Sequence, residues 1–402
     1  MSADIQHAAL SEATVTAISD ELDEPDWLRE RRLEALDALP GLEMPPVIQT
    51  PGRRWTNLHA LDFDALLDPL NAEEDKDQVG PDEINVYSLS EAVADHPDLL
   101  EEYMGNVVDP TENYLVGLST ALATTGTVIH VPEAVTGEVT IRTRMRSPSL
   151  FNYTLVVAEQ SSEVTILERQ STEEAAADDQ YYSGIVEIVG KDNASIQYGS
   201  LQDLDEDTYH YTLKRGETAR DTTIDWIECN LGSRLTKSAV ETTLAGEGSE
   251  SRIIGAFFGH NDQHLDVSSR VWHRNEHTVA DLVTRGVLDD AARSVYEGVQ
   301  HVGKEAWHTN SYQRENTLML SDESEADASP KLIINNHETE ASHSATVGQI
   351  DREDLFYMTS RGLPERTATN MLVEGFFEPV YDEIAVDELR DDLRSRIVQR
   401  LP

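Results

Sequence analysis

The sequence predicts a mostly β chain in which helical segments flank a large β-solenoid. Short β-rich runs, separated by small and polar residues, fill the chain from about residue 115 to 345. Their spacing is an irregular repeat of roughly 25–40 residues, which is typical of coils that stack their cores. Helical periodicity precedes this region and returns after Ile350. Strand propensity alone also fits a β-sandwich, so that fold remains the alternative.

The strand predictions come in pairs of β-rich runs joined by turns of similar composition. NYTLVVAE is followed by SEVTILER, IVEIVG by ASIQYG, and RDTTIDWIE by SRIIGAFFG. The turns read AEQSSE, VGKDNAS, KRGETAR, AGEGSES and LDDAARS. A small or hydroxyl residue is expected to open the strand after each turn: Ser162, Ala194, Ala219, Ser249 and Ala292.

Residues 1–112 are expected to form a mainly helical N-terminal region. Pro25-Asp26-Trp27 begins a helix, because proline suits the first turn and acidic side chains suit its positive end. Pro40-Gly41 ends that helix. The acidic segment Asn71–Asp82 is expected to be a solvated loop. The uncharged segment Asn113–Pro132 could span a membrane by length, but its Thr, Ser and Gly content favours a buried, strand-rich segment.

Residues 351–402 are expected to form a C-terminal helical domain after the solenoid core of residues 113–350. One helix is predicted to end at Gly362 and the next to begin at Pro364, because these residue types favour such positions. The last helix carries arginines toward its C-terminal, negative end. One face of this helix is apolar and consists of Val386, Leu389, Leu393 and Ile397.

The composition is strongly acidic. The chain of 402 residues has 76 acidic and 31 basic side chains, a formal net charge of −45. This charge argues against nucleic acid and against an anionic membrane as partners, since both need a basic surface. Abundant carboxylates with few lysines are typical of proteins from salt-accumulating halophiles, in which molar salt screens the repulsion. We therefore interpret most of the acidity as adaptation to the cell interior.

The cysteine content and the N-terminus favour a cytoplasmic protein without a cofactor of its own. Cys229 is the sole cysteine, so the chain cannot form an internal disulfide or bind a zinc ion or cluster through several thiolates. It is interpreted as a buried structural thiol. The N-terminus lacks the basic and apolar regions of a signal peptide.

Histidines concentrate in one part of the chain, where eight of the thirteen lie between His260 and His343. His260 and His264, and His273 and His277, both have i, i+4 spacing, and the second pair fits the inverted zinc-protease motif H-x-x-E-H. That motif requires a helix, whereas the surrounding sequence is β-rich. On a strand the two imidazoles lie about 13 Å apart, too far to share one zinc ion. Polar histidines on a solvated sheet face are the preferred interpretation.

No catalytic set emerges from the remaining motifs. Ser342-His343-Ser344 has no G-x-S-x-G context and no assignable carboxylate, so it indicates hydrolysis only weakly. The chain also lacks G-x-x-x-x-G-K-[ST], so a partner must hydrolyse ATP if ATP is used. A carbohydrate-active β-helix enzyme remains an alternative class, although no spacing identifies a carboxylate pair.

Several long segments resemble the SufB/SufD family of iron–sulfur cluster assembly proteins. The resemblance is carried by EPDWLRERRLEALDALPGLEMP and RRWTNL near the N-terminus, GTVIHVPEAV at the solenoid entry, GVLDDAARSVYEGVQHV, NSYQRENTLMLSDESEADASPKLII and, most specifically, SHSATVGQIDREDLFYMTSRGL. It implies a right-handed parallel β-helix with helical flanks. It also implies a heterodimer with a SufB-like paralogue, a SufC-like ABC ATPase bound to each subunit, and a nascent iron–sulfur cluster built by the complex.

Within the family, the chain resembles the SufD branch more than the SufB branch. SufB proteins carry a cysteine in TQCDSML, and that position falls near Glu315 here. SHSATVGQ is similar to the SufD form SHGATVG, although Ala341 and Ser344 replace the Cys and Gly of many relatives. The resemblance implies that His343 lies at the heterodimer interface and is a candidate metal ligand for a cluster shared with the paralogue. Packing at the dimer seam is the other interpretation.

An apolar cluster follows in the C-terminal helices. Leu355, Phe356 and Tyr357 stand in an otherwise acidic chain, with Arg361-Gly362 at the end of their helix. Such a cluster with a charged rim fits a SufC-like ATPase-docking surface, and packing on the solenoid end fits nearly as well. The resulting prediction is a non-catalytic scaffold subunit that can pair with itself when isolated. A SufB-like scaffold is the second choice.

Overall fold

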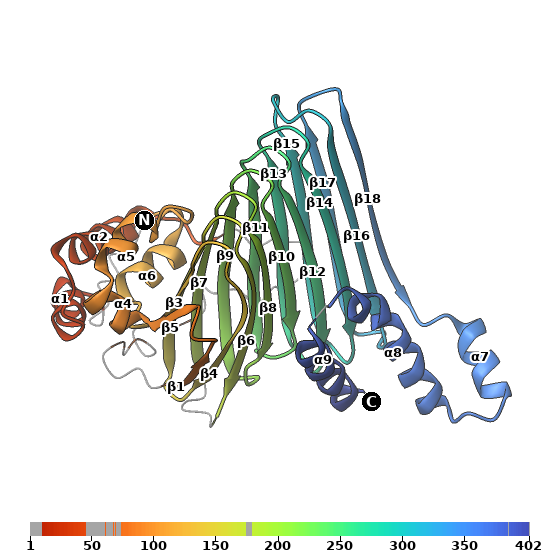
Figure 1. Ribbon diagram of the computed structural model, residues 1–402. Coiled ribbons are helices and arrows are strands. Elements are labelled where there is room, and N and C mark those ends of the chain that lie inside the picture. Colours follow the sequence, from red (N-terminus) through yellow and green to blue (C-terminus); the bar gives the residue numbers. More distant parts are fainter. Residues whose placement is uncertain are drawn as a thin grey trace.

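The computed structural model describes residues 10–45, 74–173, 179–384 and 386–401, together with Leu61, Leu67 and Pro69. The RRWTNL segment lies outside these described residues. The predicted fold class is confirmed, because the centre is a parallel β-solenoid built from two nine-stranded sheets with helices at both ends (Figure 1). Among the described residues, no helix is long and apolar enough to cross a membrane.

The solenoid alternates between two sheets, which we call sheet A and sheet B. Sheet A has the order β1-β4-β6-β8-β10-β12-β14-β16-β18, and sheet B the order β17-β15-β13-β11-β9-β7-β5-β3-β2. Sheet A comprises β1 (Glu74–Val79), β4 (Thr136–Met145), β6 (Glu163–Thr172), β8 (Ser195–Asp203), β10 (Thr223–Asn230), β12 (Glu250–Gly259), β14 (Val279–Leu288), β16 (Thr309–Met319) and β18 (Thr339–Gln349). Sheet B comprises β2 (Asn85–Ser88), β3 (Thr125–Val131), β5 (Ser149–Ala158), β7 (Gln180–Gly190), β9 (Thr208–Thr218), β11 (Leu235–Leu244), β13 (His264–His273), β15 (Arg293–Val302) and β17 (Glu325–Ile334).

The repeated turns explain why successive coils stack in register. The residue two before each of several sheet A strands has a positive φ and donates its backbone N–H to the next coil, as Ser161 does to Asp192 and Asn193 does to Arg220. Four of the five predicted strand-opening residues directly precede a strand. The prediction for Ala219 is wrong, because Ala219 follows β9 and Thr222 is the residue that precedes β10. The turn there has four residues, as have those before β6 and β8, so Thr222 occupies the position that Ser162 and Ala194 occupy in the earlier turns.

The N-terminal region consists of short helices that pack on the first coils: α1 (Glu12–Glu21), α2 (Asp26–Ala38), the 3-10 turn η1 (Leu39–Gly41), α4 (Leu89–Asp95), α5 (Pro97–Tyr103) and α6 (Tyr114–Leu122). The predicted helix after Pro25 is confirmed, with Pro25 as its N-cap. The strand-rich interpretation of Asn113–Pro132 is wrong in its first half, because Asn113 caps the buried helix α6 and β3 follows only at Thr125.

The two ends of the solenoid differ. At the first end, β1 pairs with β4 and β2 pairs with β3, both antiparallel, so strands from the N-terminal region close both sheets. The prediction of a solvated loop at Asn71–Asp82 is therefore wrong for residues 74–79, which form β1. Residues 71–73 of that segment lie outside the described part of the chain. At the second end, β17 and β18 are the last strands of their sheets, and no described strand pairs with their outer edges.

Three C-terminal helices follow β18: α7 (Arg352–Ser360), α8 (Glu365–Glu383) and α9 (Asp387–Arg400). As predicted, Gly362 follows the first helix, with a positive φ of 93°, and Pro364 is the N-cap of the second. Helices α8 and α9 pack on the sheet, whereas α7 projects away from the body of the molecule (Figure 1). The predicted apolar face of α9 is buried at Leu389, Leu393 and Ile397.

The interior of the solenoid combines apolar and polar side chains. Ile141, Ile166 and Trp226 belong to its apolar core. Polar side chains are also buried there, as in the middle coils, where Lys214 Nζ lies 2.5 Å from Glu228 Oε1. Nearer the open end, His273 and Gln300 lie 3.4 Å apart (Nε2 to Oε1), so the polar interior continues toward that end.

Candidate functional site

The candidate site lies on the inner face of β18. This strand pairs in parallel with β16, and the register places His343 directly beside Gln313. Register partners in a sheet point to the same face. The inward direction follows from Ser311, on the same face of β16, whose hydroxyl donates to Gln300 Oε1 on the opposite sheet. His343 thus faces the solenoid axis, yet it is exposed because no described coil follows.

Two buried polar side chains stand behind His343. Gln313 and Glu315 share its face and are each 1% exposed. Thr317 Oγ1 donates to Glu315 Oε1, whereas Glu315 Oε2 and both amide atoms of Gln313 have no hydrogen-bond partner in the described part of the chain. Burial raises the pKa of Glu315 to about 7, with the Thr317 hydrogen bond acting in the opposite direction. Sequence analysis predicted no role for Gln313. It singled out Glu315 only because the cysteine position of SufB proteins falls near it.

The serines next to His343 cannot act with it on one substrate atom. Ser342 and Ser344 pair with Tyr312 and Arg314, which are exposed on the outer face of sheet A. Because successive residues of a strand point to opposite faces, both hydroxyls point away from the imidazole. This geometry removes the hydroxyl–imidazole pair on which the hydrolase interpretation depended.

The i, i+4 histidine pairs do not lie on helices, and the environment of two of their members differs from the prediction. His264 and His273 are buried on β13, not on a solvated face, so that interpretation is wrong for them. His273 Nδ1 lies 2.8 Å from Thr278 Oγ1, which shows how the polar interior accommodates it. His260 and His277 lie outside β13, in turns. Each pair is therefore divided between a strand and a turn.

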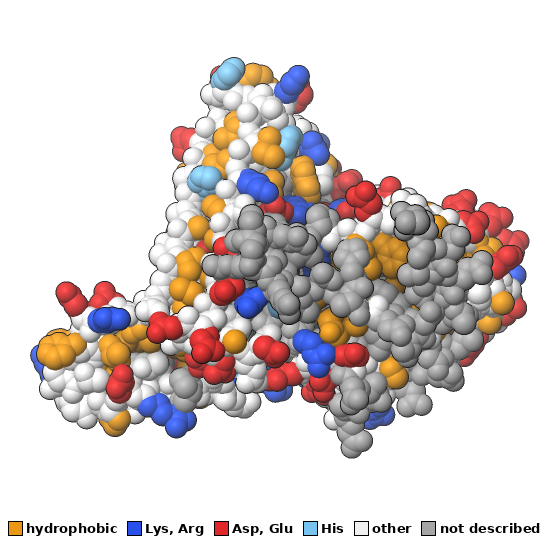
Figure 2. Space-filling view, turned by 180° about the vertical axis from the view of Figure 1, so that it is seen from behind, with side chains coloured by type: hydrophobic (Ala, Val, Ile, Leu, Met, Phe, Trp, Pro, Cys, Tyr) orange, Lys and Arg blue, Asp and Glu red, His pale blue; other side chains and the backbone are white. Residues whose placement is uncertain are grey.

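Other histidines gather near the open end, as the pale blue side chains in Figure 2 indicate. His277 and His308 stack with ring centroids 5.0 Å apart, and His308 Nδ1 lies 3.3 Å from Glu338 Oε2. His301 Nε2 lies 3.2 Å from Asn335 Nδ2. Within the described ranges, no group of three or more His, Cys, Asp or Glu side chains could hold a metal ion.

The predicted docking cluster on α7 is accessible. None of the residues of this helix is buried, and Phe356 and Tyr357 are 72% and 59% exposed. Leu355 is half-buried, and the Arg361 guanidinium lies 4.6 Å from the Tyr357 ring centroid, a cation–π contact. Hydrophobic side chains are visible on this projecting part in Figure 2 (left). These residues do not pack on the solenoid end in the isolated chain.

Helices α8 and α9, in contrast, are fixed to sheet A. Phe377, Leu389 and neighbouring side chains form one apolar cluster with the outer face of the sheet. Cys229 belongs to this cluster and is buried, which confirms its interpretation as a buried thiol, and burial raises the pKa of that thiol. Arg169 adds ion pairs with Glu388 and Asp392 of α9, at 2.9 and 2.5 Å. The platform for α7 is therefore rigidly attached.

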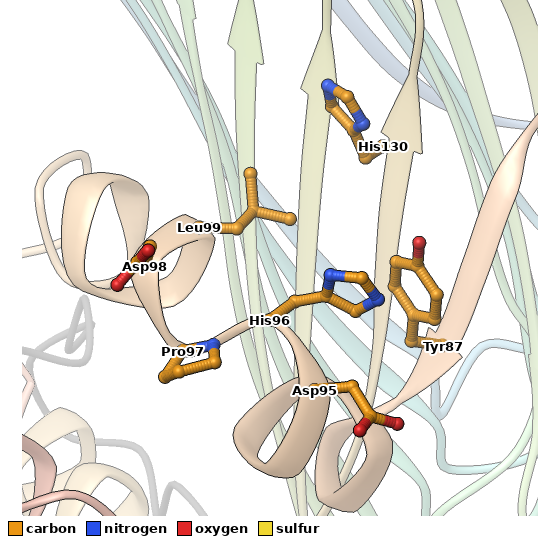
Figure 3. Close-up of a pocket in the computed structure, with 7 residues that line it drawn as sticks. All are labelled: Tyr87, Asp95, His96, Pro97, Asp98, Leu99 and His130. Atoms are coloured by element: carbon orange, nitrogen blue, oxygen red, sulfur yellow. The ribbon is translucent and has the colours of Figure 1, made fainter.

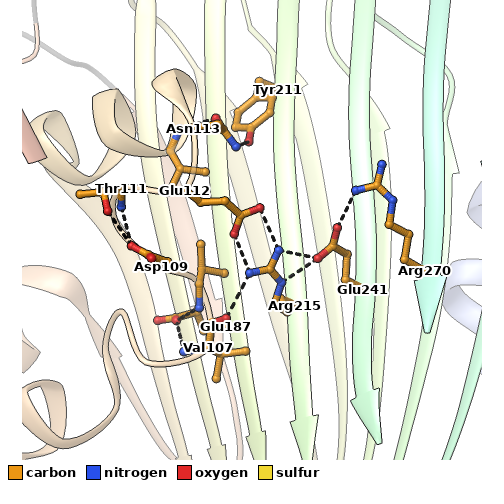
Figure 4. A network of polar contacts seen from close by, with 12 residues as sticks. Val107, Asp109, Thr111, Glu112, Asn113, Glu187, Tyr211, Arg215, Glu241 and Arg270 are labelled. Atoms are coloured by element: carbon orange, nitrogen blue, oxygen red, sulfur yellow. Dashed lines mark hydrogen bonds and ion pairs between the residues drawn. The ribbon is translucent and has the colours of Figure 1, made fainter. Parts of the chain in front are cut away.

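The N-terminal region is attached to sheet B by a chain of ion pairs (Figure 4). Arg215 on β9 contacts Glu112 at 2.7 Å and Glu241 at 2.5 Å, and Arg270 contacts Glu241 at 3.0 Å. The carboxylate of Glu187 accepts backbone N–H bonds from the nearby loop residues Gly105, Val107 and Val108. These acidic residues have structural partners and are not free for catalysis.

A cavity of about 310 Å³ lies between the N-terminal helices and sheet B (Figure 3). Tyr87, His96 and His130 line it, and the first two stack with ring centroids 4.2 Å apart. His130 Nε2 is 3.5 Å from Glu159 Oε1, and its Nδ1 is 3.3 Å from Asn85 Nδ2. Its histidines thus already have partners, and the cavity lies at the capped end, opposite to His343 along the solenoid.

A parallel β-solenoid that is closed at one end, has no described strand beyond its other end and carries an accessible helix offers surfaces on which other chains can dock. Comparison with protein families identifies which kind. Residues 141–376 match the SufBD core domain of the SUF system for FeS cluster assembly, and residues 60–143 match the SufBD N-terminal region. The core match alone covers more than half of the chain, which belongs to the SufBD family of iron–sulfur cluster assembly proteins.

Individual relatives agree with this assignment. The chain is 29% identical over 422 aligned positions to the iron–sulfur cluster assembly protein SufD of Bacillus subtilis, which covers 96% of both chains. It is 26% identical to a SufBD family protein of Synechocystis, over 89% of this chain and 78% of that protein. SufB of Bacillus subtilis is 28% identical, over 79% of this chain and 68% of its own length. The predicted resemblance to SufD is confirmed.

Proposed function

We propose that this chain is the SufD-type scaffold subunit of a SufBCD-like complex that assembles iron–sulfur clusters. The observation that supports this most directly is the open end of the solenoid, where His343 faces inward and no described strand pairs with the outer edges of β17 and β18. The proposed division of labour has three parts. Residues 1–112 close one end, residues 113–350 form the scaffold, and residues 351–402 dock the ATPase.

The proposed occupant of the open end is the solenoid of a SufB-like paralogue. The outer edges of β17 and β18 offer backbone groups to a further strand, and such edges are templates for pairing with another chain. Ile333, Ile334 and Val347 are large apolar residues exposed on these two strands, which fits a surface that is covered in a complex. The same edges allow the isolated chain to form a homodimer.

The proposed role of His343 is to bind iron of the nascent cluster, which is the cargo of the complex. The only thiol of the chain is buried under α8 and α9, so it cannot reach the open end. An imidazole is a suitable iron ligand. The cluster would then be shared between His343 and ligands of the paralogue.

The proposed ATPase-docking surface consists of Leu355, Phe356, Tyr357, Arg361 and Gly362 on and after α7. Exposed aromatic residues with an adjacent arginine are typical of energetically important positions in interfaces. Because the sequence has no phosphate loop, ATP hydrolysis is assigned to the SufC-like partner. The subunit itself is proposed to be non-catalytic, cytoplasmic and adapted to high salt.

A SufB-like function is the second candidate, supported by the 28% identity to SufB of Bacillus subtilis. It is less favoured because Glu315 occupies the expected cysteine position and supplies no sulfur ligand.

The test is copurification of the tagged chain from its own cells in high salt, followed by identification of its partners. A paralogue with the cysteine motif and an ABC ATPase in the same complex are the expected partners, and anaerobic preparations should contain iron and sulfide. A pure single chain with appreciable ATP turnover or glycan cleavage would contradict the proposal.

A further inference from the structure

We propose that Gln313 and Glu315 complete, together with His343, a three-side-chain site for divalent iron on the inner face of sheet A. The part played by His343 rests on the proposed function. Gln313 and Glu315 are new, and the argument for them comes from their burial, their direction and their unpaired atoms.

The first argument is the state of the polar atoms. Glu315 and Gln313 are each 1% exposed, and three of their four side-chain oxygen and nitrogen atoms have no hydrogen-bond partner within the described residues. Buried polar groups normally have partners, because leaving one unpaired costs about 1–3 kcal/mol. Glu315 Oε1 is held by the Thr317 hydroxyl, which leaves Oε2 as the free oxygen. An ion bound by Glu315 Oε2 and the Gln313 amide oxygen would give each of these two oxygens a partner.

The second argument is the spacing of the three residues. Gln313 and His343 are register partners on adjacent strands, about 4.8 Å apart between backbones. Gln313 and Glu315 are two residues apart on one strand, about 6.6 Å, and point to the same face. One ion between the three side chains is therefore within reach of each. An imidazole nitrogen and two oxygens on one side of an ion suit Fe²⁺, and such a facial set leaves coordination positions open.

The third argument is access. Ala341 and Ala345 flank His343 on the inner face of β18, and Ala345 is the register partner of Glu315. Both side chains are small, so neither places a long side chain between Glu315 and the open end. Gly298 opposite lets the Gln313 amide lie against the backbone, since a side chain there would collide with the amide nitrogen. The site therefore lies one strand inside the end of the solenoid where the proposed partner docks.

The experiment titrates the purified full chain with Co²⁺ under anaerobic conditions, with Fe²⁺ as competitor, and follows the cobalt absorption bands. We expect one site per chain. Glu315→Gln keeps the size of the side chain and should weaken Co²⁺ binding at least tenfold, and Gln313→Leu should weaken it severalfold. The matched control is Glu340→Gln, which removes the same charge from the outward face of the neighbouring strand β18, where Glu340 pairs with Asn310.

Equal affinities of the wild type, Glu315→Gln and Gln313→Leu would overturn the proposal, as would the absence of Co²⁺ binding by the wild type. Thermal unfolding of each variant without metal distinguishes a lost ligand from a damaged fold, because Glu315→Gln should unfold at or above the wild-type temperature. Copurification of the paralogue and the ATPase is scored separately. Intact cluster assembly with unchanged Co²⁺ affinity in Glu315→Gln would reject this site while leaving the proposed function standing.

Discussion

His343 and Gln313 occupy the same register position on the last two strands of sheet A, one exposed and the other buried. The difference arises only because a further coil covers Gln313 and none of the described coils covers His343. The inner face of the solenoid therefore continues from a buried polar interior to a surface that a partner can reach. The proposed iron-binding residue His343 therefore lies where the inner face of the scaffold becomes accessible to a partner.

The first prediction is that His343→Ala leaves the heteromeric complex assembled but sharply lowers its iron and sulfide content. A single exposed side chain contributes little to a large interface, whereas alanine cannot bind iron. The measurement is anaerobic copurification followed by iron and sulfide analysis per complex.

Ser342→Ala is the matched control for this variant, because it changes the neighbouring residue on the outer face of β18 and should retain the cluster. Loss of the complex in His343→Ala would indicate a structural histidine. Unchanged iron in an intact complex would exclude His343 and direct attention to His301, His308 and His337.

The second prediction concerns the projecting helix α7. Replacing Phe356 and Tyr357 together with alanine should abolish copurification of the ATPase, because aromatic residues of this kind often contribute 2 kcal/mol or more to an interface. The unfolding temperature of the isolated chain should change little, since both side chains are exposed.

Phe377→Ala is the opposite control, because Phe377 is fully buried between α8 and sheet A. Truncating such a side chain typically costs about 3–5 kcal/mol, so this variant should unfold at a clearly lower temperature. If the double variant on α7 also unfolds early and still binds the ATPase, its two aromatic residues belong to the core of the C-terminal domain.

The third prediction is that stability rises with salt concentration. A net charge of −45 produces strong repulsion at low ionic strength, and the screening length falls from about 10 Å at 0.1 M to about 3 Å at 1 M. The unfolding temperature should therefore rise steeply between 0.1 and 2 M KCl. Sorbitol at the same osmolality should raise it much less. Equal effects of KCl and sorbitol would argue against adaptation to a salt-rich cell interior.

Sequence periodicity predicted the solenoid and the C-terminal helices well because their apolar patterns are clear. It failed where the pattern was uninformative. Helix α6 is buried on all sides, so its sequence is uncharged, lacks a polar stripe and cannot be distinguished from a buried strand. β1 was missed because its sequence EDKDQV is charged, although charged residues are common on strands at the edge of a sheet.

The residues of the candidate site could not be predicted from the sequence pattern, for a different reason. His343 was found by resemblance alone, and nothing in its spacing marked it. β16 reads TNSYQRENTLM, with polar residues on both faces, so alternation could not indicate which face is inside. The contact between Ser311 and Gln300 and the burial of alternate residues of β16 fix the inward direction of Gln313 and Glu315. That information depends on the neighbouring coil and is absent from the strand itself.

The last prediction uses the buried His210 on β9. Burial lowers the pKa of His210 to about 3, with the nearby Lys214 acting in the same direction, whereas the unfolded chain has a histidine pKa near 6.5. Below pH 6.5 the unfolded state therefore binds a proton that the folded state does not. Stability should fall as the pH falls from 6.5 toward 3, by about 1.4 kcal/mol per pH unit from this residue alone.

His210→Gln removes this proton-binding difference, while its amide can still reach the Gln170 Oε1 atom, which lies 3.2 Å from His210 Nε2 in the wild type. The free energies of unfolding of wild type and variant at pH 8 give the packing cost of the substitution, since the histidine is neutral in both states there. On acidification to pH 4.5 the wild type should lose about 2–3 kcal/mol more than the variant. Parallel curves between pH 8 and 4.5 would mean that His210 accepts a proton inside the folded solenoid, and that its polar interior is accessible to solvent.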